Sequence, residues 1–205
     1  RGRQQLTAPI TLIGQYDSPF VRRVAIALHY YGVPFVRDHR SVFADQATLA
    51  QVNPIGRVPT LILSDGFELV DSAAILDAVD EMFGGERRLM PDSGAARRQQ
   101  MKLTAVAVGG CEKAVACLYE RHKRATDPVW LDRLEQQTDN CLVWLQQHIE
   151  QMPVPSHAQI ATAVLVHFIQ QYLPEMRDRL RPALLHSSEQ AEQMPWFQAA
   201  PFESD

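Results

Sequence analysis

Residues 53–61 read Asn-Pro-Ile-Gly-Arg-Val-Pro-Thr-Leu, so a turn-rich stretch runs straight into a short apolar run that begins with proline. Proline is tolerated at the first position of a strand because it removes no ladder hydrogen bond there. A second apolar run follows at residues 67–70, after Ser64-Asp65-Gly66. An Asp-Gly turn between two apolar runs is typical of a β-hairpin. We therefore expect strands at 59–63 and 67–70.

The residues around this hairpin alternate between strand and helix patterns. A buried strand is expected at 10–13 and a short strand at 35–36. Helices are expected from Pro19 to Gly32, around 45–51, and after Asp71-Ser72. The first of these has a serine N-cap, proline at its first position and glycine as its stop. The order β-α-β-α-β-β-α predicts an α/β unit with a mixed four-stranded sheet.

The pattern changes at residues 84–92, where two glycines and a charged run are typical of a linker. Beyond them nearly every pattern is helical. Helices are expected to begin at Ser93 and at Asp127-Pro128, each with a capping residue in front. We therefore expect an α/β domain at 9–83 and an all-helical domain at 92–205.

Three details of the helical half carry specific expectations. Ser156 and Gln159 form a capping box, in which each side chain is expected to satisfy a helix-end amide. Trp130 and Trp144 fall at helical core spacing. The apolar residues 194–197 are expected to pack back onto a surface.

Composition narrows the class of protein. The 24 acidic and 20 basic residues give a net charge of −4, whereas binding to a phosphate backbone favours an excess of basic residues. No apolar run approaches the roughly 20 residues that cross a bilayer, and no signal-peptide pattern opens the chain. We therefore expect a cytoplasmic protein that binds neither nucleic acid nor membrane.

The cysteines and histidines do not form a metal-binding pattern. Cys111, Cys117 and Cys141 include no C-x-x-C, and the seven histidines show no zinc-site spacing. We expect three free thiols in a reducing compartment, and no metal.

A hydroxyl at a helix start is the first candidate for binding. A strand followed by a short loop puts Ser18 at the N-terminal end of a helix, where free amides and the helix dipole favour an anion. A hydroxyl there is able to hydrogen-bond a ligand thiolate and keep it ionised. Taken alone, Ser18 is more simply explained as an N-cap without a ligand.

Two further candidates are Val58-Pro59 and Asp71-Ser72. A cis Val58–Pro59 peptide would turn the Val58 backbone outward for a peptide-like ligand, although most X-Pro bonds are trans. Asp71-Ser72 stands at a helix N-terminus directly after a strand. Its hydroxyl and amides suit a carboxylate and Asp71 suits an ammonium group, while capping alone is the simpler account.

Together the three candidates resemble a known family. The stretches S-P-F-V-R-R at 18–23, N-P-I-G-R-V-P-T-L at 53–61 and D-S-A-A-I at 71–75 occur in the order and at the spacings of the glutathione transferase N-terminal domain. The set is similar to the bacterial glutathione transferases that carry serine at the active-site helix start. The resemblance covers most of residues 9–85 and continues more weakly beyond. It implies a thioredoxin-like N-terminal domain, an all-helical C-terminal domain and a homodimer.

The resemblance also implies which residues bind glutathione. Ser18 would hydrogen-bond the sulfur. Val58 would pair through its backbone with the cysteinyl part, ahead of a cis Pro59. Asp71 and Ser72 would hold the γ-glutamyl end.

Five other residues receive less specific roles. Arg57 is adjacent to Val58 and would act electrostatically. His39 and Arg40 would face the glycyl carboxylate. Tyr16 and Phe20 would wall a pocket for the second substrate. Tyr16 also competes with Ser18 as thiolate stabiliser, because some transferase classes use tyrosine. The position of Tyr16 near a strand end fits a wall of the site better than a hydroxyl at a helix start.

The sequence departs from the family at two positions and has an unusual pair of glycines. The thiol-using relatives place cysteine where Ser18 stands, which argues against a glutaredoxin-like role here. The family usually carries an acid where this chain has Gln159, although glutamine is able to close the capping box. Gly109-Gly110 interrupts the first long helix at a cost of about 1 kcal/mol per glycine. The pair either opens space for the second substrate or permits close helix packing.

The expected function is an enzyme that binds reduced glutathione, stabilises its thiolate and directs it at an electrophilic small molecule. Catalysis would rest on proximity and electrostatic stabilisation. Glutathione-dependent isomerisation in the same site is a near alternative. A protein-interaction module without turnover is an alternative of another class, because fold does not fix function. Retention of Ser18, Val58-Pro59 and Asp71-Ser72 favours the enzyme.

Overall fold

The computed structural model describes residues 8–122 and 125–203. They form two compact units. The first contains the described residues up to Gly85 together with 199–203, and the second contains residues 86–198.

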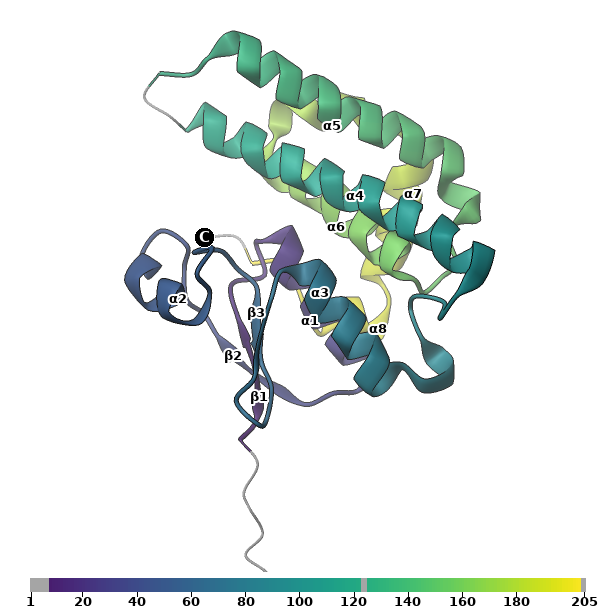
Figure 1. The fold of residues 1–205 in the computed structure, drawn as a ribbon. Coiled ribbons are helices and arrows are strands. Elements are labelled where there is room, and N and C mark those ends of the chain that lie inside the picture. The colour runs from purple at the N-terminus through teal and green to yellow at the C-terminus, as the bar shows by residue number, and fades with distance from the viewer. Residues whose placement is uncertain (1–7, 123–124, 204–205) are drawn as a thin grey trace, which may run out of the picture. The chain divides into compact units, whose positions relative to one another are not determined.

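The first unit is built on a mixed four-stranded sheet, shown in Figure 1. Its strands are β1 (Ile10–Ile13), β2 (Phe35–Asp38), β3 (Thr60–Ile62) and β4 (Glu68–Val70). They lie in the order β2-β1-β3-β4, with β1 parallel to β2 and the other neighbours antiparallel. The predicted mixed sheet is thereby confirmed.

Three helices accompany the sheet: α1 (Pro19–Tyr31), α2 (Gln46–Val52) and α3 (Ser72–Val79). A single π-helical turn, η1 (Asp80–Gly84), follows α3. The α1 helix has the predicted Ser18 N-cap and ends at Gly32, whose φ of 69° is left-handed. Residues 21–28 are all buried because α1 packs against both β1 and α3. The start of α1 is therefore held firmly against the sheet.

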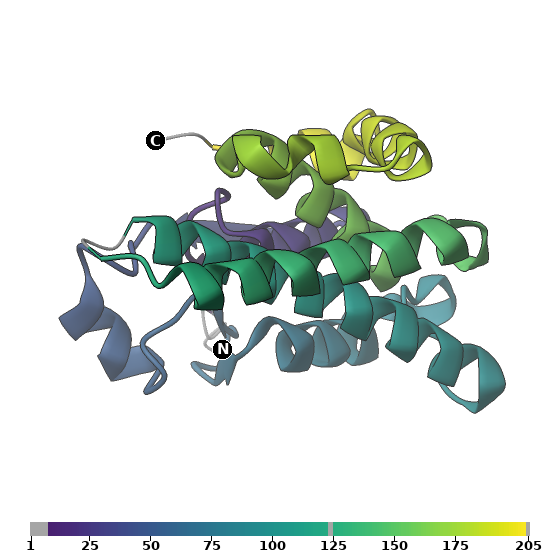
Figure 2. The same cartoon turned by 90° about the horizontal axis from the view of Figure 1, so that it is seen from above.

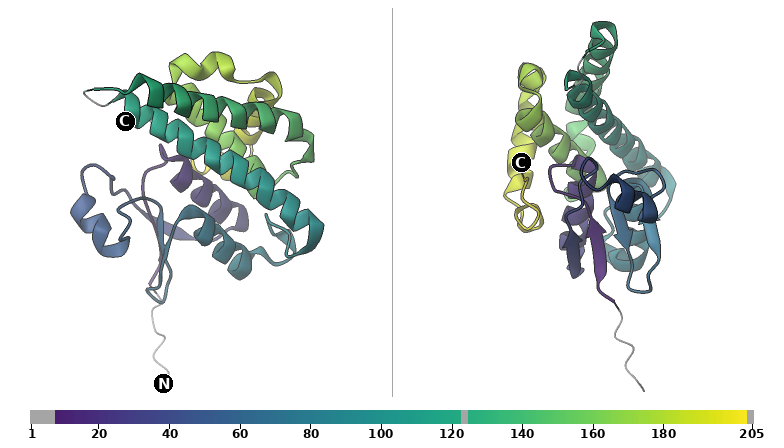
Figure 3. Two further views of the ribbon diagram at one scale, coloured as in Figure 1. Left: turned by 45° about the horizontal axis from the view of Figure 1, so that its top comes forward. Right: turned by 90° about the vertical axis from the view of Figure 1, so that its left-hand side faces the viewer.

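The second unit is helical. After the short η2 (Gly85–Arg87), its elements are α4 (Gly94–Arg121), α5 (Pro128–His148), η3 (Ile149–Gln151), α6 (His157–Tyr172), η4 (Pro174–Arg179), α7 (Pro182–Glu192) and α8 (Pro195–Gln198). The long α4 and α5 run side by side (Figures 2 and 3), and α4 also packs on α6. Most residues of α6 are buried, so α6 forms the centre of this unit. No described helix is long and apolar enough to cross a membrane.

Only one of the two hydrogen bonds of the expected capping box of α6 is formed. Ser156 Oγ accepts from the Gln159 amide at 3.1 Å, as expected. Gln159 Oε1 is buried without a hydrogen-bond partner among the described residues, so the expectation that glutamine closes the box is wrong. A neutral amide lacks the charge that draws a carboxylate to the positive end of a helix.

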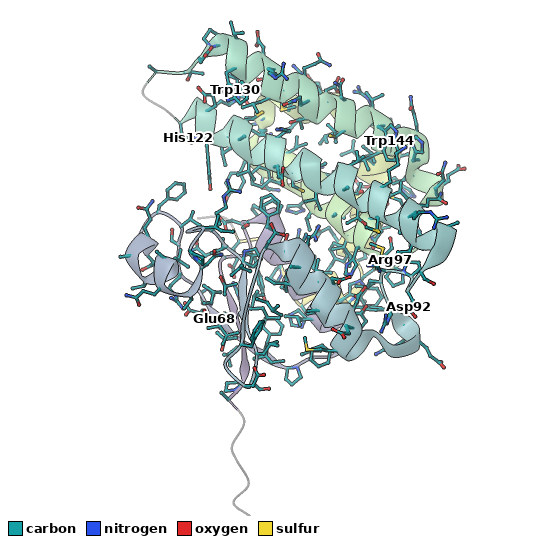
Figure 4. All side chains as sticks on the ribbon, viewed as in Figure 1. Glu68, Asp92, Arg97, His122, Trp130 and Trp144 are labelled. Carbon is teal, nitrogen blue, oxygen red and sulfur yellow. The ribbon has the colours of Figure 1, made fainter. Side chains whose placement is uncertain are left out.

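The two tryptophans of α5 have different environments, and Figure 4 labels both. Trp130 is 45% exposed, so its assignment to the core is wrong. Residues 125–130 are all exposed, so the first residues of α5 lie outside its packed part. Trp144 is half-buried and stacks on His148, with ring centroids 3.9 Å apart.

The glycine pair of α4 has two different roles. A Cβ on Gly110 would lie 2.7 Å from Leu165 Cδ2 and 3.3 Å from Cys141 Cβ. A Cβ on Gly109 would meet no described atom within 4 Å outside its own helix backbone. Close packing therefore explains Gly110, whereas Gly109 faces open space.

The last described residues return to the first unit. The expected helical domain of 92–205 includes residues 199–203, but these residues pack with the sheet domain. The carbonyl oxygen of Ala200 accepts a 2.9 Å hydrogen bond from the buried Arg22 Nε. An arginine on α1 thus supplies a polar anchor that the apolar pattern alone does not reveal.

Candidate functional site

The three predicted site segments meet at one edge of the sheet, the upper end of the strands in Figure 1. In the ladder Thr60 pairs with Ile13 on one side and with Val70 on the other. The next residues at this edge are Gly14 after β1, Pro59 before β3 and Asp71 after β4. Since neighbouring strands lie about 4.8 Å apart, the ladder register places these segments next to one another.

Ser18 stands where α1 begins at this edge. Its Oγ accepts a hydrogen bond from the Val21 amide at 3.4 Å, which is long for a capping bond. Pro19 occupies the first helical position and has no N–H. The side chain is half-buried. The oxygen thus caps the helix through a lone pair, and its hydrogen is able to point at a ligand.

Gly14 sets the distance between Ser18's helix and the Val58 loop. A Cβ on this residue would lie 2.5 Å from Val21 Cγ2 and 3.0 Å from Val58 Cβ, and its φ is 130°. Only glycine therefore lets the first turn of α1 approach Val58 so closely. The sequence pattern indicates Gly14 only as the end of a strand and does not indicate this spacing role.

The Val58–Pro59 peptide is cis. Pro59 is buried, Val58 is half-buried and Arg57 is exposed. The preceding loop is organised by the buried Asn53, whose Nδ2 donates to the Arg57 carbonyl at 2.8 Å and whose Oδ1 accepts from the Ile55 amide at 3.0 Å. Asn53 was missed as a residue that shapes the site, although its place before Pro54 is typical of a turn.

Asp71 has an unusual backbone conformation. Its φ of 67° is the one positive value found for a residue other than glycine in the described chain. Such conformations cost on the order of 1–3 kcal/mol and cluster at functional sites. Asp71 Oδ1 accepts from the Ala73 amide at 2.7 Å and so caps α3. Asp71 is exposed whereas Ser72 is 4% exposed.

Tyr16 lies beneath an ion pair that no sequence pattern indicates. The Arg37 guanidinium carbon is 3.5 Å from the centroid of the Tyr16 ring. Arg37 in turn forms a salt bridge with Glu203 at 2.7 Å. Burial raises the pKa of Tyr16 above its ordinary value, while the charge of Arg37 acts in the opposite direction and that of Glu203 adds to the rise. A raised pKa opposes ionisation of the phenol.

The other predicted residues are spread around the same edge. Arg40 bonds with Asp38 at 2.8 Å and with the Thr48 carbonyl at 3.1 Å, so its guanidinium ties β2 to α2. His39 is exposed, and Phe20 is half-buried on α1.

The three cysteines belong to the second unit. Cys111 and Cys117 are buried and Cys141 is half-buried, all three on helices of the second unit. Burial raises the pKa of Cys117 and of Cys141 above the ordinary thiol value. Within residues 8–122 and 125–203, no three His, Cys, Asp or Glu side chains are grouped so as to hold a metal ion.

Comparison with known proteins agrees with this architecture. Residues 12–87 match the family model for the glutathione S-transferase N-terminal domain. The chain is 28% identical over 114 residues to the uncharacterized GST-like protein YibF of Escherichia coli K12, over 56% of either chain. It is 33% identical over 90 residues to a probable glutathione S-transferase of Nicotiana tabacum, over 42% of this chain and 38% of that protein. The chain thus spans about half the length of YibF and less than half the length of the Nicotiana tabacum protein.

A solved structure extends the likeness to nearly the whole chain. A glutathione transferase family member from Pseudomonas fluorescens Pf-5, solved with bound glutathione, is 29% identical. The alignment covers 95% of this chain and 100% of that one, with a TM-score of 0.85. The family match thus identifies residues 12–87 as a glutathione S-transferase N-terminal domain, and the mixed sheet and the helical second unit agree with the architecture of the Pseudomonas relative.

Proposed function

We propose that this protein binds reduced glutathione at the sheet edge formed by Gly14, Pro59 and Asp71 and adds its thiolate to an electrophilic small molecule. The observation that carries the proposal is the half-buried Ser18 hydroxyl at the start of α1, in the first unit where the cis Pro59 and Asp71 flank the same edge. The bound glutathione of the Pseudomonas fluorescens relative supports the choice of ligand.

Ser18 donates its hydroxyl hydrogen to the glutathione sulfur and so favours the thiolate. Lowering a thiol pKa from about 9 to about 6.5 requires roughly 3 kcal/mol, at about 1.4 kcal/mol per unit. A hydrogen bond to a charged group contributes about 1.5–3 kcal/mol, and the N-terminus of α1 adds about 0.3–1 kcal/mol. These two contributions supply most of the required stabilisation without a general base.

The remainder of glutathione is held by the neighbouring segments. Val58 pairs with the cysteinyl part through its backbone, ahead of Pro59. Asp71 attracts the γ-glutamyl ammonium group, and Ser72 together with the α3 amides receives the carboxylate. Arg57 adds positive charge nearby. Tyr16 and Phe20 are proposed as contacts of the second substrate, and the 2% exposure of Tyr16 leaves Phe20 as the more accessible of the two.

The proposal extends to the state of the protein in the cell. We infer a cytoplasmic homodimer that uses glutathione as co-substrate and contains no metal. Glutathione-dependent isomerisation would use the same thiolate. Assays that compare activity on electrophiles with activity on isomerisable substrates separate the two reactions.

Calorimetric titration with reduced glutathione tests the proposal. Titrations at neutral pH in two buffers of different ionisation enthalpy reveal whether binding releases a proton. Binding with proton release means that the site forms the thiolate. Absence of binding, or binding without proton release, would favour an interaction module without turnover.

Variants of Ser18 assign the thiolate stabiliser. Ser18→Gly removes the hydroxyl at a cost of only a few tenths of a kcal/mol in capping. We expect it to abolish proton release and conjugation, whereas Tyr16→Phe retains both. The exposed N-cap of α5 provides the control: Asp127 Oδ1 accepts from the Val129 amide at 3.0 Å, and Asp127→Ala should reduce stability by about 1 kcal/mol without affecting glutathione. An active Ser18→Gly with an inactive Tyr16→Phe would reverse the assignment.

A further inference from the structure

One carboxylate of the 199–203 segment joins two parts of the first unit. Glu203 Oε1 and Oε2 accept from Arg37 Nη1 and Nη2 at 2.7 and 2.8 Å, a bidentate pair. Glu203 Oε2 also accepts from the backbone amide of Tyr16 at 3.1 Å. The same guanidinium lies 3.5 Å from the centre of the Tyr16 ring. Tyr16 is thereby held both through its amide and through its ring.

The segment is also bonded to α1. Arg22, which is 1% exposed, donates from Nε to the Ala200 carbonyl at 2.9 Å. The two attachments lie on either side of Ser18, at Tyr16 two residues before it and at Arg22 four residues after it. The loop of residues 14–18 and the first turn of α1 are therefore braced together by residues nearly two hundred positions later in the chain (Figure 1).

We propose that Glu203 is a positioning residue: through Arg37 and the Tyr16 amide it fixes the 14–18 loop and thereby the Ser18 hydroxyl. The inference rests on the proposed function, because the position of Ser18 matters through glutathione. A displacement of about 1 Å at a reacting group is able to cost roughly 10²-fold in rate.

Stability alone is a poor explanation of this arrangement. The Arg37 and Glu203 side chains are 23% and 36% exposed, and half-exposed ion pairs contribute about 0–1 kcal/mol to folding. What distinguishes Glu203 from an ordinary surface partner is its third hydrogen bond, which goes to a backbone amide of the loop. A hydrogen bond to a backbone amide restrains the main chain itself, and so it restrains the neighbouring residues of the loop.

The Glu203 carboxylate is ionised at neutral pH, as its bidentate pair with Arg37 requires. The hydrogen bonds from Arg37 lower the pKa of Glu203 below its ordinary value, partial burial opposes this, and the Tyr16 amide and the charges of Arg37 and His39 lower it further. The carboxylate is therefore ionised wherever glutathione chemistry would operate.

Hydrogen exchange of the Tyr16 amide tests the inference directly. Exchange is measured by nuclear magnetic resonance in the full chain for wild type, Glu203→Gln and Glu203→Ala. Glutamine still offers an oxygen to the Tyr16 amide but loses the bidentate pair, so exchange should rise in the order wild type, Gln, Ala, with at least a tenfold increase in Glu203→Ala. Asp139→Asn is the matched control, because Asp139 accepts from Arg181 at 3.0 Å with comparable exposure in the helical unit.

Titration of the same four proteins with reduced glutathione supplies the second readout. We expect Glu203→Ala to raise the dissociation constant about tenfold and to release less than the wild-type amount of protons, with Asp139→Asn unchanged. If Glu203 had a merely structural role, Glu203→Ala and Asp139→Asn would both lower stability, and Glu203→Ala would cause no selective change in proton release.

The possible failures can be told apart. Unchanged Tyr16 exchange in Glu203→Ala would overturn the positioning role, and so would faster exchange with unchanged glutathione binding. Absence of glutathione binding by the wild type would overturn the proposed function instead, while the exchange measurement still decides whether Glu203 fixes the loop.

Discussion

Gly14 is the residue whose missing side chain has the largest geometric effect on the candidate site. We expect Gly14→Ala to lower the free energy of unfolding by about 2–4 kcal/mol, since its Cβ would clash with Val21 and Val58 at a positive φ. Gly66→Ala is the matched control, because φ there is 88° but a Cβ meets nothing within 4 Å. Chemical denaturation that gives equal losses for the two variants would contradict the clash.

The charge of Asp71 can be separated from its capping role by one substitution. Asparagine caps helices as well as aspartate does and tolerates positive φ, so Asp71→Asn should leave the thermal unfolding midpoint nearly unchanged. Loss of the charge should weaken glutathione binding about tenfold, the equivalent of about 1.4 kcal/mol. Calorimetric titration measures this, with Asp127→Asn as the same chemical change at another helix start. An unchanged affinity would remove Asp71 from the binding site.

Residues that act through local chemistry were predictable from the sequence. Ser18 and Asp71 stand in patterns that specify helix starts, and the structure has both as N-caps. Their part in glutathione binding stays a prediction. Glu203 was not predictable, because its partner Tyr16 is 187 positions away and no periodic pattern links the two.

At the scale of single elements, the two adjacent glycines of α4 should respond in opposite directions to the same substitution. Gly109→Ala is expected to stabilise the protein by about 1 kcal/mol, because alanine is the better helix former and the site is open. Gly110→Ala should destabilise it by about 1–3 kcal/mol, because its Cβ would press on Leu165. Urea denaturation of both variants checks this; two changes of the same sign would contradict the packing of α4 on α6.

Elements were predicted well where short-range signals define their ends. The proline, glycine and capping residues placed α1 and the β3–β4 hairpin close to their observed bounds. The core assignment of Trp130 failed because periodicity gives the face of a helix but not how far its end extends beyond its neighbours. The one-sided capping box failed because the direction of the Gln159 side chain depends on packing that sequence spacing does not encode.

The whole molecule should lose stability in two steps as pH falls from 8 to 3. Burial and the charge of Arg37 lower the pKa of His29 in the folded state, so the unfolded chain takes up a proton first, and stability falls once pH drops below about 6.5. The lowered pKa of Glu203 gives stability that is present above about 4.3 and is lost as pH falls through the folded value.

Denaturant midpoints measured across this range test both steps. His29→Phe should remove the decrease that begins near pH 6.5, and Glu203→Gln should remove the contribution of Glu203 below about pH 4.3. A profile in which neither variant flattens its own interval would show that other groups control the acid response.

The return of residues 199–203 to the first unit also bears on the order in which the protein is made. A ribosome delivers the sheet and α1 early, but the partners of Arg22 and Arg37 are synthesised after the entire helical unit. At about 5–20 residues per second, residues 86–203 take roughly 6 to 24 seconds. The sheet domain therefore emerges before the helical unit but is completed after it, and during synthesis its 14–18 loop exists for many seconds without the carboxylate that holds it.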